Sequence, residues 1–307
     1  MNTGNKQKPS RSTQTRQQSK RWSPIITVCV VIVLALATYF GYTEILDPHH
    51  GLSDREVSVH FIDVGQGDSV LVQTSQGSVL IDGGNTNMGS RVTEYLRDAG
   101  INELTYVVAT HPHADHIGGL ITVLGEFSIG EIVMPNVAHE TRTFERFLDA
   151  IEQYDIPLRE PFVGSSFSVG DAIFTIIAPN SSSYQNLNDY SVSLRLEHGD
   201  FSFIFTGDAE RQSELEMLQH NLSAHVLHVG HHGSRTSTTQ EFLDAVNPTI
   251  AVINVGENNY GHPHGDIIDR FDNAEISVYR TDYHGNIVIR SDGSSITVRS
   301  QYNAVSN

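Results

Sequence analysis

Three histidines and an aspartate lie within six residues, at His111, His113, Asp115 and His116. They follow an apolar segment, residues 104–110, that is typical of a buried strand. Neutral imidazoles and carboxylates are the ligands that borderline divalent metals such as zinc prefer. His111 and His113 stand two apart on an extended segment, so their side chains point the same way and can reach one ion. Asp115 and His116 come on the turn into the next helix and can hold a second ion, so the loop predicts most of a two-metal site.

The alternative is an ordinary loop whose histidines are solvated or bonded to carbonyl groups. Four residues of suitable type at this spacing favour the metal site. The sequence holds a single cysteine, Cys29, so neither an intramolecular disulfide nor a cysteine zinc site is possible. Any metal must therefore be held by histidines and carboxylates.

A second candidate ligand follows the strand expected at residues 201–206. Gly207 lets the backbone turn, so that the carboxylate of Asp208 projects from the end of the strand. Asp208 is thus the candidate for a ligand that bridges two ions. Its alternative role is the N-cap of the helix expected from Ala209, which is a common position for aspartate.

Two further pairs of histidines follow later strands. His231 and His232 come directly after the strand expected at residues 226–229, and one of them can bind metal while the other faces the substrate. His262 and His264 follow a later strand, where metal binding, substrate contact and a plain loop all remain open. Either His231 or His262 could supply the last metal ligand.

The N-terminal region is predicted to be a membrane anchor. The stretch from Ser23 to Thr43 carries no charge and has the roughly 20 residues that span a bilayer. Six basic residues and no acidic one precede it, which places the N-terminus in the cytoplasm and the rest outside the cell. The competing interpretation is a signal peptide whose cleavage would release a secreted protein. The expected parts are a basic disordered cytoplasmic segment (1–23), a transmembrane signal anchor (24–46) and one extracellular domain (47–307).

The expected extracellular part is strongly acidic. Residues 48–307 hold 13 arginines, no lysine and 34 acidic residues, a formal charge of −21. Such a domain offers no broad basic surface to a polyanion, which argues against avid nucleic-acid binding. It does not exclude cleavage of phosphodiesters, because bound metal ions can be the largest local charges in a site.

The pattern of apolar segments predicts an α/β fold with two mixed sheets flanked by helices. Strands come first, separated by glycine-containing turns, and helix-like and strand-like segments alternate afterwards. Strands are expected at 57–64, 69–73, 78–81, 104–110, 131–134, 167–169, 172–177, 192–196, 201–206, 226–229, 250–255, 277–280 and 287–290, and helices at 91–99, 117–127, 142–154, 209–220 and 240–246.

Six segments together resemble the metallo-β-lactamase superfamily and, within it, the hydrolase domain of ComEC-type competence proteins and their stand-alone relatives. They are residues 61–69, 80–84, 111–120, 205–209, 229–234 and 260–264, and they recur in the family's order. The resemblance covers residues 55 to 300. It implies an αββα four-layer sandwich with two metals at the edge between the sheets.

The resemblance also implies roles for the residues that match the family's positions. His111 and His113 would bind the first ion, and Asp115 and His116 the second. Asp208 would bridge the two. Two divalent ions, zinc or manganese, are the expected cofactors.

Two more positions are implied by the resemblance, and one departs from it. His231 matches the later histidine ligand, and Asp82 matches an aspartate that braces the metal loop without binding the ion. Many members carry another histidine on the loop before the strand that leads to Asp208, but this loop has none. Asn188 or Asp189 stands there, so the first ion is expected to have fewer nitrogen ligands, more water and a manganese preference.

The expected mechanism is hydrolysis by a metal-bridging hydroxide, because two ions about 3.5 to 4 Å apart lower the pKa of a shared water toward about 7. Asp115 and Asp208 would orient it, and His232 or His262 would protonate the leaving oxygen.

The expected function is an extracellular phosphodiesterase or nuclease, with DNA or a surface phosphodiester as substrate. The alternatives are hydrolysis of another ester or a lactone, such as a phosphorylcholine ester, and a non-catalytic surface module. One membrane segment without a channel excludes DNA transport by this chain alone.

Overall fold

The computed structural model describes Met1, residues 52–53 and residues 55–302. Apart from Met1, the predicted cytoplasmic segment and membrane anchor lie outside these residues. Among the residues that are described, no helix is both long enough and apolar enough to cross a membrane.

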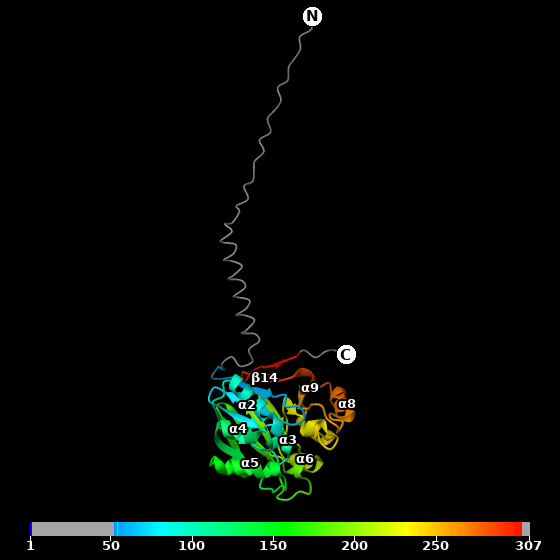
Figure 1. Ribbon diagram of the computed structural model, residues 1–307. Helices are drawn as coiled ribbons and strands as arrows, with labels where there is room; N and C mark the ends of the chain where they lie inside the picture. The colour runs from blue at the N-terminus through cyan, green and yellow to red at the C-terminus, as the bar shows by residue number, and fades with distance from the viewer. Residues whose placement is uncertain (2–51, 54, 303–307) are drawn as a thin grey trace. The chain divides into compact units, whose positions relative to one another are not determined.

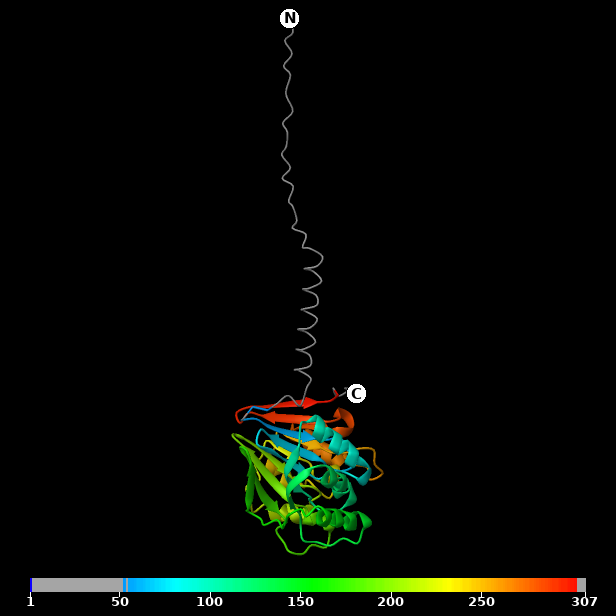
Figure 2. The ribbon, with the colours of Figure 1, turned by 60° about the vertical axis from the view of Figure 1, so that its left-hand side comes forward.

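Two mixed sheets form the centre of the described part. One has eight strands in the order β15-β14-β1-β2-β3-β4-β5-β6, and the other has seven in the order β13-β12-β11-β10-β9-β8-β7. The first contains β1 (Val57–Phe61), β2 (Val70–Thr74), β3 (Gly77–Ile81), β4 (Glu103–Val108), β5 (Ser128–Val133), β6 (Leu158–Arg159), β14 (Ile287–Ser291) and β15 (Ile296–Ser300). The second contains β7 (Ser166–Val169), β8 (Ala172–Ala178), β9 (Ser193–His198), β10 (Phe201–Phe205), β11 (Val226–His228), β12 (Ile250–Ile253) and β13 (Ser277–Arg280). In Figure 2 the C-terminal strands β15 and β14 lie in red and orange-red at one edge of the first sheet, with β14 beside blue β1.

Helices cover the outer faces of both sheets. The first group is α2 (Gly89–Asp98), α3 (Ala114–Ile117), α4 (Leu120–Glu126) and α5 (Arg142–Gln153), and the second is α6 (Arg211–Met217), α7 (Gln240–Val246) and α8 (Gly265–Asn273). Figure 1 shows α2, α4 and α5 on one side and α6 and α8 on the other. A short helix α9 (Thr281–His284) and single 3₁₀ turns at Thr86–Met88, Leu187–Tyr190 and Gly230–Gly233 complete the described elements. The predicted pair of mixed sheets flanked by helices is confirmed.

Alternating burial explains why the strands form two layers. Val70 and Val72 of β2 pack into the core between the sheets, whereas Leu71 packs toward the helices. In β3, Ile81 likewise packs between the sheets and Leu80 packs toward the helices. Because side chains of a strand alternate between its two faces, strands that are apolar at successive positions are buried on both sides.

The helices differ from the sequence prediction in three places, one of them the unexpected short helix α9. The helix expected at residues 117–127 is divided into α3 and α4 at Gly118 and Gly119. A Cβ on Gly119 would lie 1.9 Å from the carbonyl oxygen of Gly83, so the backbones approach too closely for any side chain. Helix α8 was missed because its buried apolar residues are few, Ile267 and Phe271, and it directly follows a loop-like segment.

Replacing Gly119 with alanine is expected to lower the free energy of unfolding by about 3 kcal/mol or more, because the new methyl group must displace backbone. The matched control is Gly265→Ala, since a Cβ at this first residue of α8 meets nothing within 4 Å. It should change stability by less than about 1 kcal/mol. Urea unfolding of both variants measures the difference, and equal stabilities would contradict the close approach.

Candidate metal centre

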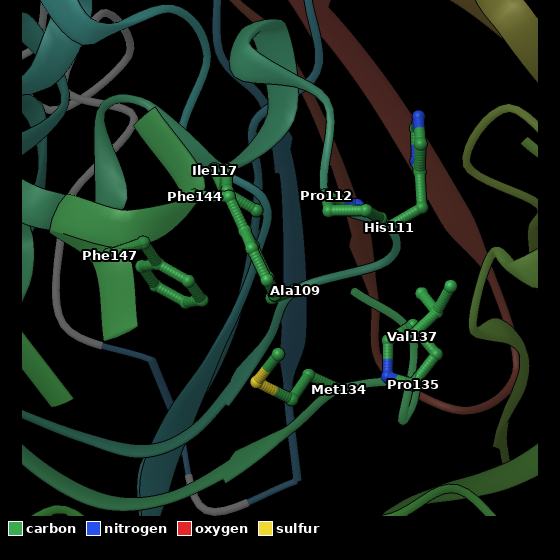
Figure 3. Close-up of a pocket in the computed structure, with 9 residues that line it drawn as sticks. All are labelled: Ala109, His111, Pro112, Ile117, Met134, Pro135, Val137, Phe144 and Phe147. Carbon is green, nitrogen blue, oxygen red and sulfur yellow. The ribbon is translucent and has the colours of Figure 1, made fainter. Parts of the chain in front are cut away.

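The predicted metal loop follows β4 in the middle of the first sheet. β4 pairs in parallel with β3 and β5, and its last residue, Val108, is buried. Figure 3 shows apolar side chains, among them Met134 and Phe147, beside the turn that carries His111 and Pro112. The hollow left among them is about 10 Å³, which is room for about one water molecule. The loop therefore rests on a packed apolar layer.

The four candidates on this loop fall into two pairs. Nε2 of His111 lies 2.9 Å from Nδ1 of His113, so both nitrogens can face one ion. His113 has an extended backbone and precedes α3, whose first turn carries Asp115 and His116. The turn of helix separates the second pair from the first, and the two pairs belong to different groups of possible metal ligands.

Asp208 projects from the end of β10, where Gly207 adopts a φ of 52°. Its side chain does not cap the following helix. That role belongs to Asp189, whose Oδ1 accepts hydrogen bonds from the backbone N–H groups of Glu210 and Ser213. The carboxylate of Asp208 is therefore left for the loop histidines.

Four imidazoles converge on the carboxylate of Asp208. Its Oδ1 lies 3.2 Å from Nε2 of His116 and 3.7 Å from Nε2 of His232. Its Oδ2 lies 3.7 Å from Nε2 of His111 and 3.6 Å from Nε2 of His231. Each carboxylate oxygen therefore faces its own pair of ring nitrogens.

The adjacent histidines after β11 reach different sides of the site. His231 and His232 both have a left-handed backbone, with φ values of 51° and 53°, which is uncommon for residues other than glycine. His232 is buried, and its Nδ1 lies 3.0 Å from the carbonyl oxygen of Asn254 and 3.2 Å from Oδ1 of Asp68. Nδ1 of His231 lies 3.3 Å from Oε1 of Glu210.

The two members of the histidine pair face different oxygens of Asp208. His232 groups with Asp115 and His116, with ligand atoms within 4.8 Å of one another. Its Nε2 is buried and faces the carboxylates of Asp115 and Asp208 at 3.5 and 3.7 Å. His232 thus belongs to a group of residues that could hold a metal ion. His231 faces the other oxygen of Asp208.

Asp82 lies behind the metal loop and is fully buried. It accepts hydrogen bonds from the backbone N–H of Thr110, at 2.9 Å, and from the hydroxyl of Thr110, at 2.7 Å. Its Oδ2 also lies 2.8 Å from Nδ1 of His116. Because Nδ1 of His116 is held in this way, Nε2 is directed toward Asp208.

Asn188 and His262 lie apart from the ligand groups. Nδ2 of Asn188 donates a hydrogen bond to Oε1 of Glu210, at 2.9 Å, and does not reach the histidines of the loop. The ring of His262 lies 5.4 Å from that of His231 and 6.4 Å from that of His232, and it lines the same pocket. His262 is thus placed beside the centre, not inside it.

Three supporting residues were missed by the sequence reasoning. Asp68 contacts His232 as described above, and Glu210 contacts His231. The hydroxyl oxygen of Ser191 accepts a hydrogen bond from the backbone N–H of Asp208 and lies 3.3 Å from Nδ1 of His111. The available signals were weak, because an aspartate in a glycine-rich turn and a glutamate at a helix start have ordinary structural roles.

A family model, described as the metallo-beta-lactamase superfamily, matches residues 62–256. The match includes every candidate ligand from His111 to His232. The chain belongs to the metallo-β-lactamase superfamily.

Two curated proteins with competence-related names are similar to the chain. It is 33% identical over 256 residues to ComE operon protein 3 of Bacillus subtilis (strain 168), an alignment that covers 76% of this chain and 33% of that protein. It is 31% identical over 258 residues to competence protein ComA of Neisseria gonorrhoeae, covering 82% and 34%. The predicted resemblance to the ComEC-type domain is confirmed, and the chain spans about a third of the length of these relatives.

A solved structure with the same fold is the metallo-beta-lactamase fold protein YhfI from Bacillus subtilis. The TM-score is 0.52 at 12% identity, and the match covers 76% of this chain and 100% of that one. At this identity the likeness concerns the fold alone.

The electrostatics of the superfamily site favour a bound cation. Burial alone would raise the pKa of Asp208, but His116, His232 and His231 hold that pKa well below its usual value. Burial alone would lower the pKa of His116, but Asp208 and Asp82 raise it well above its usual value. A proton on His116 therefore balances buried carboxylates in the absence of metal, and a divalent cation can take its place.

The donor atoms fit a metal. Three buried atoms, Nε2 of His116, Nε2 of His232 and Oδ1 of Asp208, make no hydrogen bond to any described residue. Buried polar atoms are normally satisfied. Imidazole nitrogens with carboxylate oxygens form a donor set that zinc and manganese both accept.

Glu214 of α6 holds the segment that follows the histidine pair, at Thr238 and Thr239, through hydrogen bonds. Its carboxylate oxygens accept hydrogen bonds from the backbone N–H groups of Thr238 and Thr239, and Nη1 of Arg270 donates to the carbonyl oxygen of Thr238. Burial raises the pKa of Glu214 from 4.5 to about 7. The stabilisation that follows from this raised pKa is complete below about pH 4.5 and is lost as the pH rises through about 7.

Glu214→Gln is therefore expected to show a weaker decline of stability between pH 4.5 and pH 8 than the unmodified protein. Relative to the unmodified protein, the unfolding free energy of Glu214→Gln should rise by about 3 kcal/mol between pH 4.5 and pH 8. Denaturant unfolding at several pH values measures it. A difference that does not vary with pH would show that Glu214 does not titrate there.

Proposed function

We propose that the chain is a metal-dependent phosphodiesterase that holds two divalent ions, zinc or manganese, on either side of Asp208. The observation that carries this proposal is the division of four ring nitrogens between its two oxygens. Nε2 of His116 and of His232 face Oδ1, whereas Nε2 of His111 and of His231 face Oδ2. With this division, Asp208 would offer one oxygen to each ion.

The ligands of the second ion would be Asp115, His116, His232 and Oδ1 of Asp208. The first three form a group with ligand atoms within 4.8 Å of one another. His111, His113 and Oδ2 of Asp208 form the group on the other side and would hold the first ion. When bound, two such ions supply Lewis acidity and lower the pKa of a water molecule.

The side chains around the ions have distinct roles in the proposal. Asp115 is 29% exposed and lines the pocket, so its carboxylate is placed to accept a hydrogen bond from the attacking water. Burial and the neighbouring His231 and His232 lower the pKa of His262 to about 4. A neutral imidazole can donate one N–H, so we assign His262 to a hydrogen bond with a substrate oxygen.

The pocket suits an anionic substrate with a flat ring. It encloses about 330 Å³ beside the ligand groups and is lined by Tyr260 and His262. Tyr260 is 70% exposed and offers a face on which a base can stack. Nη2 of Arg235 lies 3.4 Å from Nδ1 of His264, so a positive charge stands near His262, whose ring is 5.3 Å from that of His264.

The relatives favour DNA-derived phosphodiesters over other esters or lactones, because they are named for the com operon and for competence. The acidic composition argues for short or single-stranded substrates rather than for tight binding of long duplexes. The proposal also keeps the domain outside the cell, held by the anchor predicted at residues 24–46.

The test is a substrate panel with the purified full-length chain, loaded with Zn²⁺ or Mn²⁺. The panel comprises bis-p-nitrophenyl phosphate, single-stranded DNA, p-nitrophenyl phosphorylcholine and nitrocefin. The proposal predicts hydrolysis of the first two, lost on chelation. Hydrolysis of p-nitrophenyl phosphorylcholine alone, which is also a phosphodiester, would keep the reaction class but contradict a DNA-derived substrate. Hydrolysis of nitrocefin alone would contradict the proposal in favour of a lactam, and no hydrolysis by metal-loaded protein would indicate a non-catalytic module.

A further inference from the structure

We infer that Glu210 is a positioning residue. It orients the ring of His231 so that this ring supplies the missing nitrogen ligand of the first ion. The inference rests on the proposed function and assigns a role to a residue that the ligand groups do not contain. It also explains how the site functions without the histidine that many superfamily members carry before β9.

The contacts form a chain from Asn188 to the metal centre. Nδ2 of Asn188 donates a hydrogen bond of 2.9 Å to Oε1 of Glu210. The same oxygen lies 3.3 Å from Nδ1 of His231, and Nε2 of that ring lies 3.6 Å from Oδ2 of Asp208. A carboxylate on one ring nitrogen fixes the tautomer that leaves the other nitrogen free for a metal.

Glu210 is available for this role because another residue caps the helix. Asp189 accepts the N–H groups at the start of α6, including that of Glu210 itself. The side chain of Glu210 is therefore directed at the loop of His231.

The loop before β9 shows why a substitute ligand is needed. Ser191 of this loop contacts the site, since its hydroxyl lies 3.3 Å from Nδ1 of His111 and accepts a hydrogen bond from the backbone N–H of Asp208. A serine there supports ligands and provides no imidazole. The left-handed backbone at His231, with a φ of 51°, brings a ring to the same oxygen of Asp208 that His111 faces.

The two sides of the centre then differ in composition. The first ion would have three imidazoles, from His111, His113 and His231, and one carboxylate oxygen. The second would have two imidazoles and two carboxylate oxygens. The first side should therefore favour zinc, since nitrogen-rich sites suit zinc while oxygen ligands suit manganese. This reverses the expectation that the first ion has few nitrogen ligands.

The test measures metal affinity rather than turnover. The full-length chain, freed of metal, is titrated with Zn²⁺ in a calorimeter, and ion content is counted by mass spectrometry. Two ions should bind to the unmodified protein. Glu210→Ala should weaken one of the two sites by about 10- to 100-fold, and Glu210→Gln, which keeps an acceptor oxygen, should recover most of the loss. Glu152→Ala, an exposed change on α5, is the control and should change nothing.

A double-mutant cycle separates positioning from a general structural effect. His231→Ala should weaken the same site by more than Glu210→Ala does, and adding Glu210→Ala to it should have no further effect. Equal weakening by Glu210→Ala in both backgrounds would overturn the inference. So would two ions bound with unchanged affinity by His231→Ala. An unmodified chain that binds no divalent ion would instead overturn the proposed function itself.

Discussion

Replacing Asp208 with alanine is expected to reduce metal-dependent hydrolysis by about 10³-fold or more. The reason is that both of its oxygens are used, so that one substitution removes a ligand from each ion. Two ions contribute several kcal/mol of transition-state stabilisation, and about 4 kcal/mol corresponds to about 10³-fold in rate. Steady-state turnover of bis-p-nitrophenyl phosphate at saturating Mn²⁺ or Zn²⁺ measures the loss.

The matched control is Asp149→Ala, because Asp149 is an exposed aspartate in the middle of α5. It removes the same charge far from the ligand groups and should leave turnover unchanged. Activity of Asp208→Ala within tenfold of the unmodified protein, with metal bound, would show that the bridging carboxylate is not central to the reaction.

Replacing Asp82 with alanine is expected to lower the free energy of unfolding by about 3 to 5 kcal/mol. The substitution strands three buried donors, the N–H and hydroxyl of Thr110 and Nδ1 of His116, and removal of one partner from a buried charged network has a cost of this size. Because His116 then loses its orientation, affinity for one ion should fall by about 10- to 100-fold.

Denaturant unfolding and metal titration of the same preparation separate the two effects of Asp82. Asp82→Asn keeps an acceptor oxygen and should recover part of the stability. If the alanine variant were as stable as the unmodified protein, the buried carboxylate would have no bracing role, whatever the activity.

Local pattern was sufficient to predict the two mixed sheets flanked by helices and the position of the histidine loop after β4. Largely apolar segments such as 104–110 are typical of strands, and the residues that follow such a strand lie at the edge of the sheet. The spacing of His111, His113 and Asp115 then indicates which side chains can share an ion. Their relative positions depend only on a few consecutive backbone angles.

The different orientations of His231 and His232, whose rings face different oxygens of Asp208, could not be predicted in this way. It depends on left-handed backbone angles at both residues, which sequence favours only at glycine. Likewise, Glu210 and Asp68 act through contacts with residues that are distant in the chain. Asn188, which was expected near the first ion, instead contacts Glu210, because packing of the loop before β9 places its amide beside α6.

The most direct test of the account is a crystal structure of the chain grown with Zn²⁺, with anomalous scattering used to locate the ions. We expect two peaks about 3.5 to 4 Å apart, one in contact with each carboxylate oxygen of Asp208. The peak at Oδ1 should lie beside His116 and His232, and the peak at Oδ2 beside His111 and His231. A folded chain with no peak there, or with a single peak that does not touch Asp208, would contradict the two-ion site.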